Sequence, residues 1–397
     1  MSTYLLLSPH YPPRLFPFAT ALRNHGFVVV GIGDAQPHEL KNELRENLAE
    51  YLPLPLDCYS GKGVFDEYRY DVIYRAVARL VAQHGRLDGI ESFNEYWLPL
   101  ESRLREDFNV PGPRPAELEG MIRKSRMKLT FASVGVPVVP GKIVQDYREL
   151  LNFLATEKTI IVKPDIGVGA FDTHKVASVD EAEAFWAKRD PNVLYFMERF
   201  IQGPDRELLS FDGIADGNGD VAFAAVHPVN DGLLEIVSGG IIAYHNTLQT
   251  EISLVLRRYG EATVKAFGLR RRFFHIEFFR VGEIFYGLEL NARPPGVLTL
   301  DMMNHSRGID IWKAWAAIVA GKNGPIECPR DLICFYTARV NRLNYKYSNE
   351  ELMSRLGNSI VFSHPMDSPV MGDFGFLAVA ATHDERRRII EEISLEK

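Results

Sequence analysis

Five polar side chains near residue 290 could together bind a metal ion and a phosphoryl group. The runs 274–279 and 286–296 alternate apolar and aromatic residues with polar ones, which is typical of strands, and 280–283 supplies a turn between them. An odd-length loop around Gly282 would bring matching residues of both strands to one face, because side chains alternate with period two. The side chains expected on this face are His275, Glu277, Glu289, Asn291 and Arg293.

The chemistry of that face suits Mg²⁺ and phosphate. Hard cations take oxygen ligands, which Glu277, Glu289 and Asn291 offer, and the guanidinium of Arg293 can pair with phosphate oxygens. A solvated sheet face with unrelated polar residues is the alternative interpretation. For His275 we expect a structural hydrogen bond, with orientation of Glu277 as the alternative. The opposite face is apolar and is expected in the core; it carries Ile276, Phe278, Leu288 and Leu290.

The order of motifs along the chain resembles the ATP-grasp superfamily. The resemblance runs from about residue 5 to residue 321 and includes six segments in the family's order. They are the basic helix 121–128 leading to Gly-Val-Pro at 135–137, the lid strand 160–164, the small-residue loop 167–170, the adenine hinge 197–205, the acidic strand pair with its Glu-x-Asn-x-Arg run at 289–293, and the helical segment 302–315. Each motif alone is a weak signal, whereas six in order are a strong one.

The resemblance implies a phosphate site built from lysines. Lys163 lies in an apolar strand, where an unpaired charge is costly, and is implied as the clamp on the α- and β-phosphates. Lys124 and Lys128 lie four residues apart on one helix face, which by resemblance points at the nucleotide. A basic cluster of this kind is otherwise a solvated helix face.

The resemblance also implies contacts to adenine and ribose. Glu198 would accept a hydrogen bond from the adenine amino group, and the main chain as far as Ile201 would supply a donor. The alternative for Glu198 is an ordinary charge at a strand end. Asp205 is implied at the ribose, where the family usually has Glu, and Glu207 competes for this role. The segment 238–244 is either a substrate loop or a bulge.

The implied reaction joins a carboxylate to an amine. ATP and Mg²⁺ (or Mn²⁺), as two ions held by Glu277, Glu289 and Asn291, would place the γ-phosphate for attack by the carboxylate. The resulting acyl phosphate would react with the amine, with ADP and phosphate as products. Arg293 would hold the carboxylate and then the developing oxyanion. This chemistry requires no Ser/His/Asp or Cys/His nucleophile, and none stands out.

Other functions remain open beside the amino-acid and dipeptide ligase branch, which the chain resembles most. One is a carboxylase-like or purine-biosynthetic enzyme that acts on bicarbonate or formate. The purine branch typically has Pro-Arg-Pro-His after its metal Glu, where this chain has Ala-Arg-Pro-Pro at 292–295. Another is a non-catalytic nucleotide-binding protein, against which the joint presence of Glu277, Glu289, Asn291 and Arg293 argues.

At 397 residues the chain is too long for one core. A strand, a helix and a strand within 4–34 predict the start of a doubly wound parallel sheet, and strand 87–92 ends in Asn94-Glu95 at the carboxyl edge where such sheets bind ligands. The fold class is therefore α/β, with α+β character in the ATP-grasp part. The expected division is a Rossmann-like domain at 1–115, a linker helix and nucleotide lid at 116–203, a large metal-bearing subdomain at 204–325, and a C-terminal strand and helix extension at 326–397.

The composition restricts the classes of binding partner and the cellular compartment that we expect. The formal net charge of −7 argues against nucleic acid or an anionic membrane as the main partner. Three cysteines without metal-ligand spacing predict free thiols in a reducing compartment. No apolar run approaches the ~20 residues of a membrane span, and the start lacks the basic region of a signal peptide. We expect a cytoplasmic protein that acts on small-molecule carboxylates and amines, with a homodimer as a possible assembly.

Overall fold

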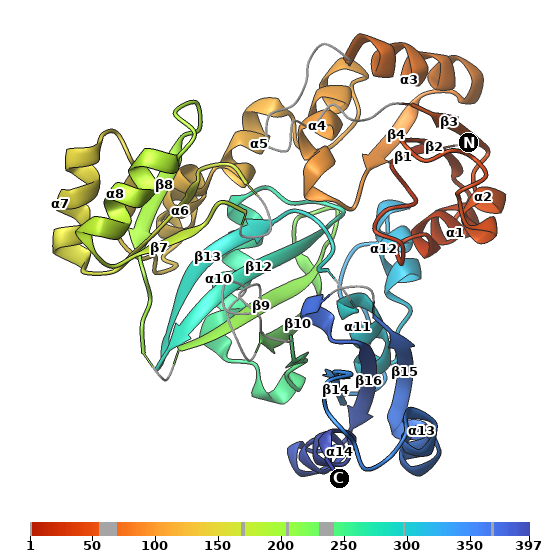
Figure 1. Cartoon of the computed structure of the whole chain (residues 1–397). Coiled ribbons are helices and arrows are strands. Elements are labelled where there is room, and N and C mark those ends of the chain that lie inside the picture. The colour runs from red at the N-terminus through yellow and green to blue at the C-terminus, as the bar shows by residue number, and fades with distance from the viewer. Residues whose placement is uncertain are drawn as a thin grey trace.

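Three β-sheets organise the chain in the computed structural model, which describes residues 2–54, 70–167, 171–203, 206–229, 242–296, 298–366 and 369–397. In Figure 1 the N-terminal sheet lies at the upper right, the sheet of the segment predicted as the lid at the left and the large sheet between them. A parallel first sheet followed by two mainly antiparallel sheets confirms the predicted α/β class.

The N-terminal sheet is parallel, with the strand order β3-β2-β1-β4. Its central strands are short apolar runs that are almost completely buried, as expected for a parallel sheet covered on both faces. α1 begins at Pro17, and the proline fits the first helical turn. The bounds are β1 (Thr3–Leu7), α1 (Pro17–Asn24), β2 (Val28–Gly33), α2 (Asn42–Asn47), β3 (Glu50–Pro53), α3 (Tyr70–His84) and β4 (Leu87–Glu91).

Helices link this sheet to the lid, whose antiparallel sheet has the order β5-β8-β6-β7. Asp146 and Ser178 cap the two lid helices, because each side chain accepts a hydrogen bond from a backbone N–H of the first turn. The bounds are α4 (Leu98–Asp107), α5 (Pro115–Ile122), α6 (Lys124–Ser133), β5 (Gly141–Ile143), α7 (Tyr147–Glu157), β6 (Ile160–Pro164), β7 (His174–Val176), α8 (Val179–Lys188) and β8 (Tyr195–Arg199).

The large sheet has eight strands in the order β13-β12-β9-β10-β11-β14-β16-β15. The C-terminal strands therefore continue the sheet that carries the acidic hairpin. The expected helical segment 302–315 is two helices, because Gly308 adopts a left-handed conformation (φ 68°) between them. The bounds are β9 (Arg206–Ala215), β10 (Val221–Val229), β11 (Tyr244–His245), α10 (Leu254–Ala266), β12 (Arg272–Val281), β13 (Ile284–Asn291), α11 (Thr299–Arg307), α12 (Ile311–Val319), β14 (Ile333–Arg339), α13 (Asn349–Leu356), β15 (Ile360–Pro365), β16 (Phe374–Ala380) and α14 (His383–Ser394).

The hairpin of β12 and β13 corrects one prediction about its loop. The strands end at Val281 and restart at Ile284, so the loop has two residues and an even length, with Gly282 at φ 57°. Such a loop alone would pair Glu277 with Leu288. A β-bulge between the pairs Glu277–Glu289 and Phe278–Gly287 leaves Leu288 without a partner and shifts the register by one residue. The bulge, and not the loop, places Glu277 opposite Glu289.

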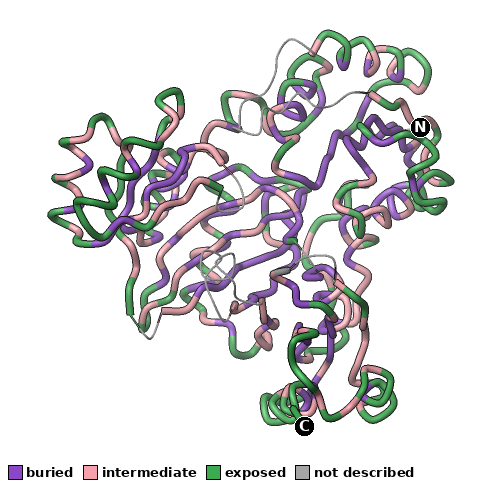
Figure 2. Tube along the Cα trace, in the orientation of Figure 1, coloured by how far each residue is buried: buried purple, intermediate pink, exposed green. Residues whose placement is uncertain are grey.

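A buried aromatic cluster joins the first sheet to the large sheet. The ring of Trp315 on α12 lies 5.0 Å from that of Phe18, 5.3 Å from that of Phe93 and 5.8 Å from that of Tyr4, measured between centroids. Figure 2 shows that the strands of both sheets are largely buried where the two parts meet. Every helix in the described ranges is too short or too polar to cross a membrane.

A buried ion network lies beside this cluster. Arg272 on β12 donates from Nη2 to Glu91 (2.9 Å) and Glu101 (2.7 Å), and from Nε to the carbonyl of Ala292 (2.6 Å). Arg105 lies 2.8 Å from Glu101. Burial raises the pKa of Glu91 to about 7, although the charge of Arg272 opposes the shift. The network therefore ties the hairpin to the carboxyl end of β4.

Replacing Arg272 should destabilise the protein strongly. In Arg272→Ala, buried Glu91 loses its cation and buried Glu101 keeps only Arg105, so we expect the free energy of unfolding to fall by about 3–5 kcal/mol. The exposed neighbour Arg270 is the control, and Arg270→Ala should change it by less than about 0.5 kcal/mol. Denaturant titration followed by circular dichroism measures both. Equal, small effects of the two substitutions would contradict a structural role of the network.

Candidate active site

The acidic hairpin presents its polar residues in register. Glu277 pairs with Glu289 and His275 with Asn291 across β12 and β13, and directly opposite residues share one face of a sheet. The other face is apolar, and Phe274, Ile276 and Phe278 are fully buried there. Leu288 departs from the predicted core set, since it is the bulged residue and only half-buried.

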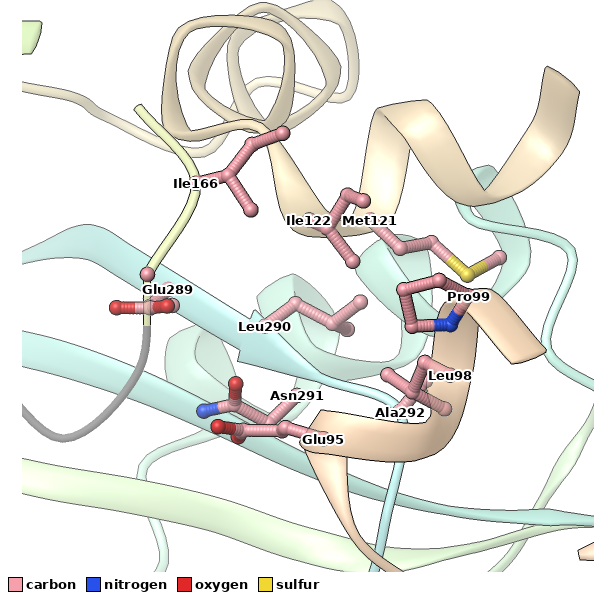
Figure 3. A pocket seen from close by; sticks show the side chains of 11 residues that line it. Glu95, Leu98, Pro99, Met121, Ile122, Ile166, Glu289, Leu290, Asn291 and Ala292 are labelled. Carbon is pink, nitrogen blue, oxygen red and sulfur yellow. The ribbon is translucent and has the colours of Figure 1, made fainter. Parts of the chain in front are cut away.

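The donor set of this hairpin fits a hard cation with open positions. In Figure 3, Glu289 and Asn291 extend into one pocket, where Glu95 of the N-terminal part also points. Within the described ranges, no group of three or more His, Cys, Asp or Glu side chains is arranged to hold a metal by itself. Two carboxylates and one amide leave coordination sites of a six-coordinate ion for phosphate oxygens and water.

His275 holds Glu277 from the neighbouring position on β12. Its Nε2 lies 3.3 Å from Glu277 and its Nδ1 lies 2.5 Å from Asp212 on β9. Burial lowers the pKa of His275, but Asp212 outweighs this effect and raises it to about 10. Burial would raise the pKa of the Glu277 carboxyl, but the hydrogen bond and charge of His275 outweigh burial and lower it. His275 is therefore an imidazolium near neutral pH, and both predicted alternatives for it occur together.

Asp212 was missed by the sequence analysis. It is fully buried on β9 and also contacts His227 Nδ1 on β10 and the hydroxyl of Ser210, each at 2.5 Å. Burial would raise the pKa of Asp212, but the two histidines lower it well below its usual value. An aspartate inside an otherwise apolar strand was an available signal, because a buried carboxylate needs partners.

Two lysines converge on Glu198 at the end of β8. Lys163 Nζ from β6 lies 2.6 Å from Oε1, and Lys128 Nζ from α6 lies 2.8 Å from Oε2. Burial would raise the pKa of Glu198, but the charges of Lys128 and Lys163 lower it to about 2. Glu198 is consequently a carboxylate at every physiological pH. The two lysines predicted for phosphate are thus both paired with the residue predicted for adenine.

One oxygen of Glu198 retains hydrogen-bonding capacity. Lys128 Nζ lies 2.8 Å from the buried Oε2, and among the described residues no further donor reaches the second lone pair of this oxygen. Lys128 also donates to the carbonyl of Gly287 on β13, at 3.0 Å. Burial lowers the pKa of Lys128, whereas for Lys163 the nearby carboxylates, Glu198 foremost, outweigh burial and raise it.

Lys124 connects the lid to the acidic hairpin. It begins α6, and its buried Nζ lies 3.5 Å from Glu289 and donates to the carbonyl of Gly167 at 2.9 Å. Gly167 is the first residue of the predicted phosphate loop, and the following residues 168–170 lie outside the described part of the chain. A single cation therefore touches both the predicted metal site and the start of the predicted phosphate loop.

Arg293 is held by Glu95, which the sequence placed only at the carboxyl edge of the N-terminal sheet. Its Nε and Nη2 lie 2.8 and 2.7 Å from Glu95 Oε1, and its Nη1 donates to the carbonyl of Pro294 at 2.8 Å. Glu95 follows β4 at the carboxyl edge of the N-terminal sheet. The long separation in sequence, 198 residues, explains why this pair was not predicted.

The remaining predicted residues lie near the hinge after β8. Ile201 is half-buried and its carbonyl accepts a hydrogen bond from Arg206 at 3.1 Å. Asp205 and most of the segment 238–244 lie outside the described residues. Glu207, the competitor of Asp205, is on β9 and lies 3.8 Å from Arg280.

The pocket beside the hairpin has a polar side and an apolar side (Figure 3). Its polar groups come from Glu95, Glu289 and Asn291, and its apolar wall comes from four separate segments of the chain. The apolar residues are Leu98, Pro99, Met121, Ile122, Ile166, Leu290 and Ala292. A site of this kind, apolar with a few convergent polar groups, is suited to an organic substrate that carries a charged end.

Comparisons with known proteins agree with this architecture. The chain is 24% identical over 280 residues to an L-arginine-specific L-amino acid ligase of Bacillus subtilis; the match covers 66% of this chain and 65% of that relative, just under two thirds of its length. No protein-family model matches the chain.

Solved structures match the whole length. An L-amino acid ligase from Bacillus licheniformis superposes with a TM-score of 0.71 at 15% identity, over 99% of this chain and 97% of that one. An N5-carboxyaminoimidazole synthetase from Staphylococcus aureus, in complex with ADP, gives 0.71 at 14% identity, over 98% and 96%. The biotin carboxylase domain of a 2-oxoglutarate carboxylase from Hydrogenobacter thermophilus, with MgADP and bicarbonate, gives 0.66 at 15%, over 95% and 86%. The chain therefore has the ATP-grasp fold that these solved structures share.

Proposed function

We propose that the protein is an ATP-dependent carboxylate–amine ligase that forms an amide bond through an acyl phosphate. The observation that carries this proposal is the position of Lys124, which touches Glu289 of the acidic hairpin and the backbone at Gly167. A γ-phosphate bound between these two groups would lie on the side of the hairpin where Arg293 follows β13, two residues after its end. The likeness to L-amino acid ligases supports the choice of branch.

ATP would bind between the lid and the hairpin. Lys124 and Lys163 would neutralise phosphate charge, and Lys128 would remain near Glu198. Oxygen Oε2 of Glu198 is suited to accept a hydrogen bond from the adenine amino group, because it is buried and no described donor besides Lys128 reaches it. The main chain at Ile201 would face the adenine ring, and Asp205 is proposed at the ribose.

Glu277, Glu289 and Asn291 would hold Mg²⁺, proposed as two ions, with Mn²⁺ as the alternative metal. Bound there, the metal supplies charge neutralisation and orientation of the phosphates. His275 keeps Glu277 ionised and fixes its direction, which is the usual task of a histidine behind a ligating carboxylate. The division of the chain at 115, 203 and 325 is part of the same proposal, in which the lid closes on the nucleotide.

The chain's own groups would then guide two transfers. Arg293 would position the substrate carboxylate for attack on the γ-phosphorus, and it would stabilise the oxyanion when the amine adds. To do so, its guanidinium must bind substrate in place of, or together with, Glu95. The apolar wall of the pocket would exclude water from the acyl phosphate, which otherwise hydrolyses. The substrates are small carboxylates and amines, and a homodimer is the possible assembly.

A second candidate is an enzyme that acts on bicarbonate or in purine biosynthesis. It is favoured by the fold match to an N5-carboxyaminoimidazole synthetase, which is as good as the match to an L-amino acid ligase. It is disfavoured by the Ala-Arg-Pro-Pro sequence at 292–295, which departs from that branch. A nucleotide-binding protein without turnover is the third alternative.

The metal site is tested by Glu289→Gln. The substitution keeps the size of the side chain and removes its charge, so the fold should persist while turnover falls by about three orders of magnitude or more, as when a preorganised charged group is lost. Glu283→Gln, on the exposed hairpin loop, is the control and should keep full activity. Coupled-enzyme assays of ADP release and thermal melting measure both effects. Full activity of Glu289→Gln with a normal melting curve would remove Glu289 from the site.

The nucleotide site is tested by Lys163→Ala. Loss of the phosphate clamp should weaken ATP binding or lower turnover, and the affinity for the carboxylate measured without nucleotide should not change. The exposed Lys188→Ala on the lid helix α8 serves as control. Isothermal titration with ATP and with the carboxylate separates the two affinities. Unaltered nucleotide affinity together with unaltered turnover would refute the clamp.

The reaction class is tested by its products. An attack on the γ-phosphorus yields ADP and phosphate, and hydroxylamine should trap the acyl phosphate as a hydroxamate when no amine is supplied. Arg293→Ala should suppress trapping, whereas Arg342→Ala in an exposed loop should not. Chromatography of nucleotides and a colorimetric hydroxamate assay give the result. AMP in place of ADP would overturn the mechanism, and ADP release that needs bicarbonate alone would favour the second candidate.

A further inference from the structure

A row of polar side chains crosses the large sheet and ends at a buried imidazole nitrogen without a partner. The strand register places Glu289, Glu277, Ser210 and His227 directly beside one another on β13, β12, β9 and β10. Directly opposite residues on neighbouring strands point to the same face, so all four belong to the face that carries the acidic hairpin. His227 is 2% exposed, and no atom of the described residues forms a hydrogen bond with its Nε2.

We propose that His227 Nε2 is the proton acceptor for the amine substrate, and that Asp212 is the residue that positions it. This inference rests on the proposed ligase function and adds the site of the second substrate, because it places the ammonium group over β9 and β10. Neighbouring strands lie about 4.8 Å apart, so His227 is about 10 Å from Glu277 along the row, which leaves room for an acyl phosphate beside it.

The hydrogen bonds of Asp212 define the tautomer of His227. An ionised carboxylate only accepts hydrogen bonds, so the Nδ1 atoms of both His227 and His275 must donate to it. In a neutral His227 the Nε2 atom therefore carries a lone pair, and the bond from Nδ1 to Asp212 stabilises the imidazolium that forms when Nε2 takes a proton.

An amine substrate needs such an acceptor. At neutral pH an aliphatic amine is an ammonium ion and cannot attack a carbonyl carbon until one N–H proton is removed. His227 Nε2 would take this proton, after which the nitrogen lone pair forms the new C–N bond to the acyl carbon. The C–O bond to phosphate then breaks and phosphate leaves with the electron pair. The second N–H proton is lost to the departing phosphate, and the proton on His227 returns to solvent.

The charged and titratable groups around His227 come from three neighbouring strands. Among the described residues they are Asp212 on β9, His275 on β12 through Asp212, and His245 on β11. Burial and the positive charge of Arg386 lower the pKa of His245 to about 3, so this second imidazole stays neutral. The nitrogen Nε2 of His227 is shielded, so the amine must displace the atoms that cover it.

The experiment compares two nucleophiles in the variants His227→Asn and His227→Gln. Asn keeps a donor near the Nδ1 position for Asp212 and removes the base, whereas Gln places a non-basic group near Nε2. The common L-amino acids are screened for ADP release by the wild type, and the fastest pair is then assayed. Hydroxylamine replaces the amine in a parallel assay, because it is already unprotonated at neutral pH and needs no base.

Both variants should lose about 10²–10⁴-fold in the rate of amide formation, yet form hydroxamate at the wild-type rate. Their deficit should also shrink as the pH approaches the pKa of the substrate amine, where free amine is abundant. The matched control is His245→Asn, which removes the neighbouring imidazole and should leave the ratio of the two rates unchanged. Thermal melting checks that each variant is folded.

An equal loss with both nucleophiles, or no loss with the amino acid, would overturn the role of His227. Amide formation at the wild-type rate in His227→Asn, but not in His227→Gln, would also overturn this role. The Asn variant keeps the hydrogen bond to Asp212 but has no basic group. These outcomes leave the proposed function intact, provided that the wild type releases ADP and forms hydroxamate. A wild type that does neither would overturn the ligase proposal and this inference with it.

Discussion

Charge pairing in a shielded site is the constraint on which the arrangement of this protein depends. Glu277 and Glu289 face each other on neighbouring strands, and like charges in directly opposed positions repel. The repulsion is offset by Lys124 beside Glu289 and by protonated His275 beside Glu277. The same rule governs the lysine pair around Glu198. A triphosphate with its metal would enter a site whose cations are already fixed in direction, which is preorganisation.

The contacts that fix those directions come from distant parts of the chain. Helix α6 supplies Lys124 and Lys128, which reach both the lid and β13. The network around Arg272 ties the end of the hairpin to β4, and Glu95 from the same edge of the N-terminal sheet holds Arg293. The three sheets therefore meet at one place, and the pocket lies where they meet. Movement of the lid relative to the hairpin would change the surroundings of all three lysines together.

Much of the fold and of the candidate site could be predicted from the sequence, and each prediction that failed has an identifiable physical reason. The strands carrying Lys163, Glu277 and Glu289 follow from local alternation and apolar runs, which need no tertiary information. The pairing of Glu95 with Arg293 joins two distant parts of the chain, and local secondary-structure propensity does not predict such a contact. The position of Asp212 between two histidines depends on the register of three strands. The facing of Glu277 and Glu289 was predicted correctly for a wrong reason, since a bulge provides it.

That bulge has a consequence for how the hairpin can evolve. Leu288 is the one extra residue between the loop and the acidic pair. Deleting any single residue between Gly282 and Leu288 would therefore have one of two results. Either the bulge is lost, or Glu289 and the residues after it turn to the apolar face. Length changes of two residues in the same stretch would preserve the facing. Natural variation in this hairpin should therefore come in even steps, or in an odd step accompanied by the loss or the gain of a bulge.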